Sequence, residues 1–139
     1  MFNIDPKIWG HSAWEFLFNV GMSYSNNPTA EEKENMKNFL LNLGKILPCQ
    51  KCRSNFYGHL NKYPLNDYSL NNRVNFLNWL TAINNEVRQI NGNKVLTPNE
   101  MINKYLSKDG NCDIWSNFLY ISSLLLIVII LIMLVKFRY

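Results

Sequence analysis

The sequence predicts an all-α protein: a four-helix bundle with a short fifth helix, followed by a C-terminal transmembrane helix. Apolar residues recur at helical spacing in successive segments, and capping or helix-breaking residues separate those segments. A chain of 139 residues is long enough to bury one hydrophobic core but not two. We therefore expect one domain over residues 1–107, a linker over 108–113, a membrane anchor over 114–135 and a basic tail over 136–139.

The first two predicted helices cover residues 8–25 and 29–47. The apolar face of the first consists of Trp9, Ala13, Phe16, Leu17, Val20 and Tyr24. The apolar face of the second consists of Met36, Phe39, Leu40, Leu43, Ile46 and Leu47. Thr29 and Glu32 have the spacing of a capping box, and Pro48 ends the second helix.

Three further helices follow. The third begins at two cysteines and runs to about residue 62, and Ser69 is a suitable N-cap for a fourth that closes at Asn91 and Gly92. The inward face of the fourth is predicted to be Val74, Leu77, Leu80, Ile83, Val87 and Ile90. Thr97 and Glu100 frame a short fifth helix that ends near residue 106. Bundles of this kind bind cofactors between facing helices.

The most informative motif is Cys49-Gln50-Lys51-Cys52, directly after Pro48. A helix that starts here places both sulfurs at its positive end, where unpaired N–H groups favour a thiolate. Lys51 and Arg53 act in the same direction. From spacing alone the pair is either a redox-active dithiol or half of a zinc site.

Composition narrows the function classes. The net charge is +4, but the basic residues are scattered and no base-reading motif is present, so we expect no nucleic-acid partner. The first residues lack a basic region followed by an apolar run, so we expect no secretory signal peptide. Three cysteines cannot form a disulfide framework, which favours a catalytic or metal-binding role for the pair.

Three motifs together resemble a known family. They are Trp9-Gly10-His11-x-x-Trp14, Pro48-Cys49-x-x-Cys52 and Trp79-x-x-x-x-Asn84-Asn85-x-Val87. In this order and spacing they are similar to the Erv/ALR family of FAD-linked sulfhydryl oxidases. The family often has His where this chain has Phe18 and Asn84, and Asn where it has Arg88. Short viral members also show Phe and Asn at the two His positions, so the chain resembles a viral-type member.

The resemblance implies a bundle that holds FAD against the dithiol, commonly in a homodimer. Cys49 would be the thiol that exchanges with substrate, and Cys52 would lie nearest the flavin. The implied cofactor-binding residues are Gly10, His11, Trp14, Phe18, Trp79, Asn84, Asn85, Val87, Arg88 and Lys94. Aromatic rings, amides and cations are the side chains that a flavin, its adenine and its pyrophosphate require.

The resulting prediction is a thiol oxidase that forms disulfide bonds in proteins. Two electrons would pass from a substrate dithiol to the Cys49–Cys52 pair by thiol–disulfide exchange, then to FAD and to molecular oxygen, which gives hydrogen peroxide. The expected substrates are proteins with a dithiol of their own, of the thioredoxin-like kind.

Two alternatives remain open. A zinc-binding module would use Cys49, Cys52, His59 and Cys112, but paired knuckles are missing, and we expect no metal. His59 is predicted to lie on the surface, and Cys112 is interpreted as a spare thiol. The second alternative is a flavin-free, membrane-anchored thiol–disulfide carrier.

The predicted anchor has no charged residue between Ile114 and Val135. At about 1.5 Å per residue, a helix over this run reaches roughly the 30 Å of a bilayer's hydrocarbon core. Trp115 and Lys136 suit the two interfaces. We expect a single-pass C-terminal anchor in a host-cell or virion membrane, with the catalytic domain facing the cytosol.

Overall fold

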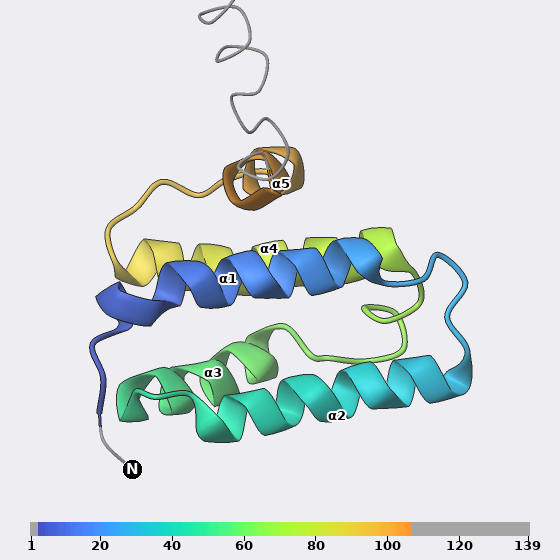
Figure 1. Cartoon of the computed structure of the whole chain (residues 1–139), viewed down its shortest axis with the longest axis horizontal. Helices are drawn as coiled ribbons and strands as arrows, with labels where there is room; N and C mark the ends of the chain where they lie inside the picture. The colour runs from blue at the N-terminus through green and yellow to red at the C-terminus, as the bar shows by residue number, and fades with distance from the viewer. Residues whose placement is uncertain (1–2, 107–139) are drawn as a thin grey trace, which may run out of the picture. The chain divides into compact units, whose positions relative to one another are not determined.

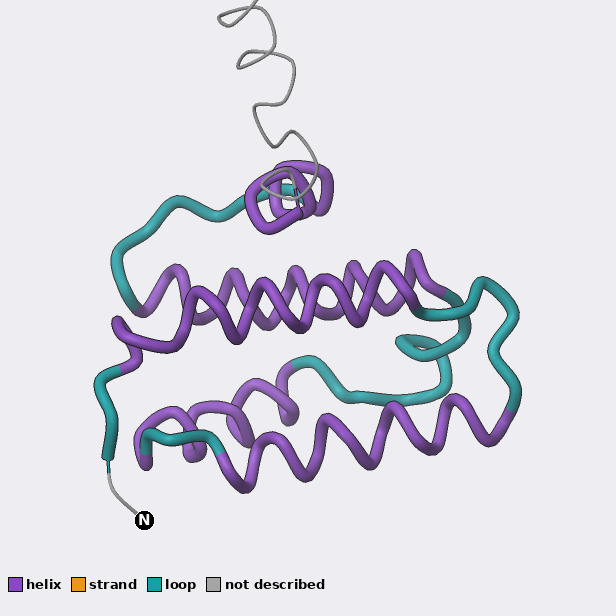
Figure 2. Tube along the Cα trace, viewed as in Figure 1, coloured by secondary structure: helices purple, strands orange, loops and turns teal. Residues whose placement is uncertain are grey.

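The computed structural model describes residues 3–106, and within this range helices are the only regular secondary structure (Figures 1 and 2). The helices are α1 (Pro6–Ser23), α2 (Ala30–Ile46), α3 (Gln50–Lys62), α4 (Arg73–Ile90) and α5 (Pro98–Leu106). The predictions of an all-α domain and of four longer helices with a short fifth are confirmed.

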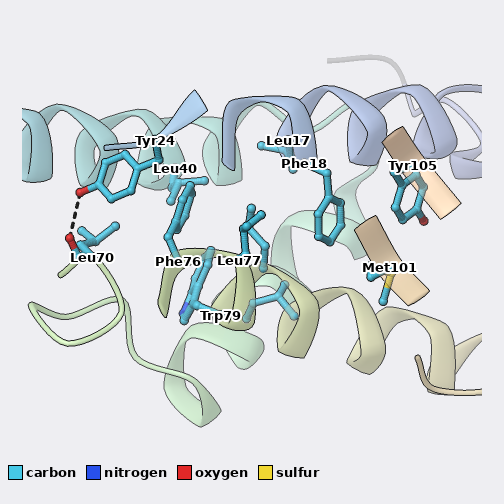
Figure 3. Packing of buried hydrophobic residues seen from close by; sticks show 12 residues of the cluster. Leu17, Phe18, Tyr24, Leu40, Leu70, Phe76, Leu77, Trp79, Met101 and Tyr105 are labelled. Carbon is cyan, nitrogen blue, oxygen red and sulfur yellow. Dashed lines mark hydrogen bonds between the residues drawn. The ribbon is translucent and has the colours of Figure 1, made fainter. Parts of the chain in front are cut away.

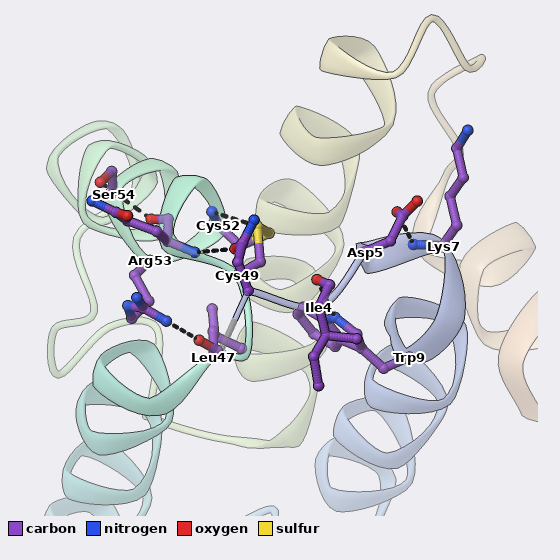
Figure 4. The surroundings of a disulfide bond; sticks show 11 residues. Ile4, Asp5, Lys7, Trp9, Leu47, Cys49, Cys52, Arg53 and Ser54 are labelled. Carbon is purple, nitrogen blue, oxygen red and sulfur yellow. Dashed lines mark hydrogen bonds between the residues drawn. A yellow bond between two sulfur atoms is a disulfide. The ribbon is translucent and has the colours of Figure 1, made fainter. Parts of the chain in front are cut away.

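The helices pack in two pairs with α5 across one of them. α1 lies beside α4, and α2 lies beside α3 (Figure 1). α5 contacts both α1 and α4. In Figure 1 it is seen nearly end-on while α1 and α4 run across the picture, so α5 crosses them at a steep angle. This arrangement brings the start of α3 close to the start of α1 (Figure 4).

The predicted capping boxes are confirmed at two helices, α2 and α5. The Thr29 hydroxyl accepts from the Glu32 N–H at 3.1 Å, and the Glu32 carboxylate accepts from the Thr29 N–H at 2.7 Å. Thr97 and Glu100 form the same reciprocal pair before α5. The predicted cap of α4 at Ser69 is wrong. Asn72 is the N-cap, and its side-chain oxygen accepts from the Asn75 N–H at 2.8 Å.

One hydrophobic core joins the helix pairs (Figure 3). Its buried members are Leu17, Phe18, Tyr24, Leu40, Leu70, Phe76, Leu77, Trp79, Leu80, Ile83, Met101 and Tyr105. Four predicted core positions are wrong, because they lie on the solvent side of their helices: Phe16, Ile46, Val74 and Ile90. Val74 is 62% exposed, whereas Phe76, two residues later, is fully buried.

Specific contacts fix the helices at two places. The Tyr24 hydroxyl at the end of α1 donates to the Leu70 carbonyl at 2.9 Å (Figure 3). Gly44 in α2 lies against the ring of Phe56 in α3, so closely that a Cβ at this position would overlap the ring. This close approach sets the position of α3, which carries the two cysteines.

The predicted membrane anchor concerns residues that the structure does not describe. Among residues 3–106 no helix is long and apolar enough to cross a bilayer. The predicted linker, the anchor over 114–135, the basic tail and Cys112 lie outside the described residues.

Candidate active site

A cavity of about 790 Å³ opens between the helices and includes both cysteines in its wall. Its size is in the range typical of small-molecule and cofactor sites. Eight of the predicted site residues line it: Gly10, His11, Trp14, Cys49, Cys52, Asn84, Val87 and Arg88. The fold therefore brings residues from α1, the start of α3 and the second half of α4 to one cavity.

Cys49 and Cys52 form a disulfide at the N-terminus of α3 (Figure 4). Cys49 is the N-cap residue, and its Sγ accepts a hydrogen bond from the Cys52 N–H at 3.1 Å. No acidic residue occupies the first turn of the helix. The predicted helix start at the cysteine pair is confirmed. The unpaired N–H groups at this end of a helix are of the kind that favours a thiolate over a thiol.

The N-terminal segment lies over the loop that carries Cys49. The Ile4 N–H donates to the Pro48 carbonyl at 2.8 Å, and the Gln50 N–H donates to the Asn3 side-chain oxygen at 3.0 Å. Figure 4 shows Ile4 among the residues around the disulfide, and Cys49 is only 5% exposed. No local pattern in the sequence indicates this contact, because Asn3 and Gln50 are 47 positions apart.

Tyr105 of α5 organises the wall of the cavity between α1 and α4. Its ring stacks on Phe18 at 5.1 Å between centroids and meets the edge of His11 at 5.4 Å. Its hydroxyl accepts from the Asn84 side-chain N–H at 3.3 Å. The Asn84 side-chain oxygen is buried and has no hydrogen-bond partner among the described residues, which is a position suited to a ligand donor.

The charge of the cavity wall is predominantly positive. The basic side chains on it are Lys7, Lys51, Arg88 and Lys104, and the acidic one is Asp5. Asp5 is already occupied as the N-cap of α1, where it accepts from the Lys7 N–H at 2.9 Å. Such a wall suits a ligand that combines aromatic rings with negative charge.

Comparison with known proteins identifies the family. The family model described as Erv1 / Alr matches residues 11–107, which include both cysteines and the residues of α4 on the cavity. The chain belongs to the Erv1/Alr family.

Two viral proteins that are named FAD-linked sulfhydryl oxidases are similar to this chain. A protein of Acanthamoeba polyphaga mimivirus named "Probable FAD-linked sulfhydryl oxidase" is 41% identical over 99 residues, which are 71% of this chain and 69% of the relative. The FAD-linked sulfhydryl oxidase of African swine fever virus is 32% identical over 97 residues, or 70% and 79% of the two chains.

Solved structures show the same fold. The crystal structure of the yeast Erv1 core matches with a TM-score of 0.66 at 24% identity, over 76% of this chain and 87% of that one. The crystal structure of the FAD binding domain of Erv1 from Saccharomyces cerevisiae matches with a TM-score of 0.66 at 25% identity, over 74% and 95%.

Four residues that the Erv1/Alr resemblance assigned to the cofactor do not line the cavity. Phe18 is fully buried in the core, and the Trp79 indole N–H donates to the Tyr63 carbonyl at 3.0 Å. Asn85 binds the backbone of the loop before α5, and Lys94 offers its carbonyl to the Arg88 Nε at 2.7 Å. Their cofactor contacts stay predictions, whereas their packing and hydrogen bonds are observed.

The prediction that His59 lies on the surface is wrong. It is 7% exposed and lines the cavity two turns after Cys52 on the same helix, and its Nε2 has no partner among residues 3–106. Burial lowers the pKa of His59, and the charge of Lys62 acts in the same direction, while Glu86 opposes the shift. The i, i+7 spacing from Cys52 was the signal that could have placed it on the cavity face.

The zinc alternative gains no support from the described residues. Within residues 3–106 no group of three or more His, Cys, Asp or Glu side chains is placed to hold a metal ion. The fourth candidate ligand, Cys112, lies outside that range.

Proposed function

We propose that the protein is an FAD-linked sulfhydryl oxidase that forms disulfide bonds in protein substrates. The observation that carries this function is the Cys49–Cys52 disulfide in the wall of the cavity, in a chain of the Erv1/Alr family. Relatives at 41% and 32% identity are named FAD-linked sulfhydryl oxidases.

The residues present fit FAD. Trp14, His11 and Tyr105 provide aromatic surface, and the unpaired side-chain oxygen of Asn84 provides a buried hydrogen-bond acceptor. The basic residues supply positive charge for a pyrophosphate. When bound, FAD would supply an acceptor for the two electrons and two protons of the reduced dithiol and a route for them to oxygen, with hydrogen peroxide as the product.

The disulfide carries out the exchange with substrate. A substrate thiolate attacks Cys49 Sγ, the Cys49–Cys52 bond breaks, and Cys52 leaves as a thiolate at the positive end of α3. The second substrate thiolate then attacks the substrate sulfur that is bonded to Cys49 Sγ. This step forms the substrate disulfide and releases Cys49 as a thiolate. The substrate has lost two electrons and two protons, and the enzyme dithiol has gained them.

The direct test combines spectroscopy with oxygen uptake. The purified protein is expected to carry the yellow absorbance of oxidised flavin and to consume oxygen when a dithiol is added, with hydrogen peroxide as product. A colourless, well-folded protein that only exchanges disulfides would instead establish the thiol–disulfide carrier. Bound zinc without flavin would establish the metal module.

We also propose that the domain forms a homodimer. A shallow, largely apolar hollow lies between α1 and α2 and is lined by Phe16, Val20, Met36 and Phe39, among others. Phe16 is 57% exposed, and its ring meets that of Phe39 edge-on at 6.3 Å. Sedimentation velocity tests the dimer, because Phe16→Glu should convert it to a monomer if this face is the interface.

The proposed location is a membrane, anchored through residues 114–135 with the catalytic domain on the cytosolic side. The support is the uncharged run in the sequence. Alkaline extraction of membranes tests the anchor, and protease protection of the catalytic domain tests its side.

A further inference from the structure

Two cations stand together on the cavity wall between the end of α4 and α5. Arg88 donates through Nε to the Lys94 carbonyl at 2.7 Å, which holds the guanidinium in place and leaves its terminal nitrogens for other partners. Lys104 extends over the ring of Tyr105, with Nζ 5.3 Å from the ring centroid. Both side chains line the cavity.

Neither cation has a carboxylate partner in the part of the chain that the structure describes. The single ion pair within residues 3–106 joins Lys62 to Glu86. Burial, and then the charge of Arg88, lower the pKa of Lys104, so the two groups are close enough to repel. Like charges held together at a partly enclosed site favour a bound anion.

Lys94, the predicted phosphate contact, is placed differently. It does not line the cavity, and its charge acts on Glu100, whose pKa is lowered first by hydrogen bonds from Thr97 and also by Lys94. Lys94 therefore has an acidic neighbour, whereas Arg88 and Lys104 face the cavity without one.

We propose that Arg88 and Lys104 together bind the pyrophosphate of FAD and thereby select FAD over flavins that lack it. This inference rests on the proposed function. The pyrophosphate is the only charged part of FAD, and an Arg fork beside a Lys point charge matches its oxygens. Lys104 is then a specificity-determining residue that the sequence motifs did not indicate.

The experiment compares FAD with riboflavin, which has the same ring system and no phosphate. Both ligands are titrated into the full chain after removal of bound flavin, and binding is followed by the quenching of flavin fluorescence. The variants are Lys104→Gln, Lys104→Arg, Lys94→Gln and Lys37→Gln. The last removes the same charge from an exposed position on α2 outside the cavity.

Lys104→Gln is expected to weaken FAD binding by about tenfold to a hundredfold, the loss of one charged hydrogen bond, and to leave riboflavin binding unchanged. Lys104→Arg should retain most of the preference, and the other two variants should keep all of it. Three results would overturn the proposal. Lys104→Gln could lose FAD and riboflavin binding equally, or it could lose no FAD binding. The selective loss of FAD binding could also occur in Lys94→Gln instead. A parent chain that binds neither flavin would overturn the proposed function itself and this inference with it.

Discussion

Asn85 has two possible roles that an experiment can separate. It is either a cofactor contact or a structural clamp, meaning a side chain that holds the loop before α5 through two hydrogen bonds. Its side-chain N–H donates to the Leu96 carbonyl at 2.8 Å, and its side-chain oxygen accepts from the Leu96 N–H at 2.9 Å. Asn85→Ala removes both bonds and leaves two half-buried backbone groups without partners. At about 0.5–1.5 kcal/mol for each hydrogen bond, the expected loss in the free energy of unfolding is about 2 kcal/mol.

Such a loss is large for a single domain, whose whole stability is about 5–15 kcal/mol. Urea unfolding followed by circular dichroism measures it as a shift of the midpoint with an unchanged slope. Asn93→Ala is the matched control. Among residues 3–106, the Asn93 side chain donates one exposed hydrogen bond, to the Asn91 carbonyl at 3.4 Å, and its loss should change stability by less than about 0.5 kcal/mol.

The same variant tests the role that the family resemblance implied. The clamp model predicts that Asn85→Ala loses stability, and that added FAD restores part of it by binding only the folded state. If Asn85→Ala is as stable as Asn93→Ala but no longer binds FAD, the clamp reasoning is refuted and Asn85 is a cofactor contact.

Three further predictions concern the cysteine pair, the contact between α2 and α3, and His59. Cys49→Ser should abolish turnover with protein dithiols while the protein keeps its flavin, and Cys52→Ser should abolish flavin reduction; equal, mild losses in stopped-flow and oxygen-uptake assays would contradict these roles. Gly44→Ala should destabilise the fold by about 1–3 kcal/mol in thermal unfolding, because the added methyl group overlaps a ring of α3; unchanged stability would show that α3 can move away. Burial lowers the pKa of His59, so its contribution to stability is present above its ordinary value of 6.5 and is lost as pH falls through the folded pKa. His59→Gln should therefore reduce the stability lost below pH 6.5 in urea unfolding, and an unaltered pH profile would contradict this.

Helix ends were predictable where the signal is local. The Thr29 and Thr97 capping boxes each lie within four residues and formed as expected. The start of α4 was misplaced by a few residues because Ser69 and Asn72 are both good caps. Ser69 instead closes a turn, where its hydroxyl accepts from the Asn66 N–H at 2.9 Å.

Which side of each helix is buried was harder to predict than where the helix begins and ends. A helical period shows that one face is apolar, but the packing partners decide which of two neighbouring faces is covered. In α1 the fully buried ring is that of Phe18, because α4 and α5 both pack on that side, while Phe16 faces solvent. No property of α1 alone distinguishes these two phenylalanines.

The residues of the candidate site also fall into two groups: those that a local sequence motif indicates and those that only packing brings to the site. The cysteine pair and the residues near the start of α1 and the end of α4 belong to motifs, so the sequence indicated them. Asn3, Lys104 and Tyr105 come to the cavity or its rim from the chain's first residues and from α5, and no local pattern marks them. Their positions follow from packing between distant segments.

Tyr105 explains how this chain accommodates its departures from the family pattern. The position where the family often has His is Phe18 here, and its ring stacks on Tyr105 at an interplanar angle of 9°. A hydrocarbon ring cannot offer a hydrogen bond to a ligand, but the tyrosine that it supports lines the cavity and carries a hydroxyl. That hydroxyl in turn orients the Asn84 amide, the second departure, so that its oxygen is left for a donor. The two substitutions are therefore coupled through one residue of α5, and a change at Tyr105 should disturb both.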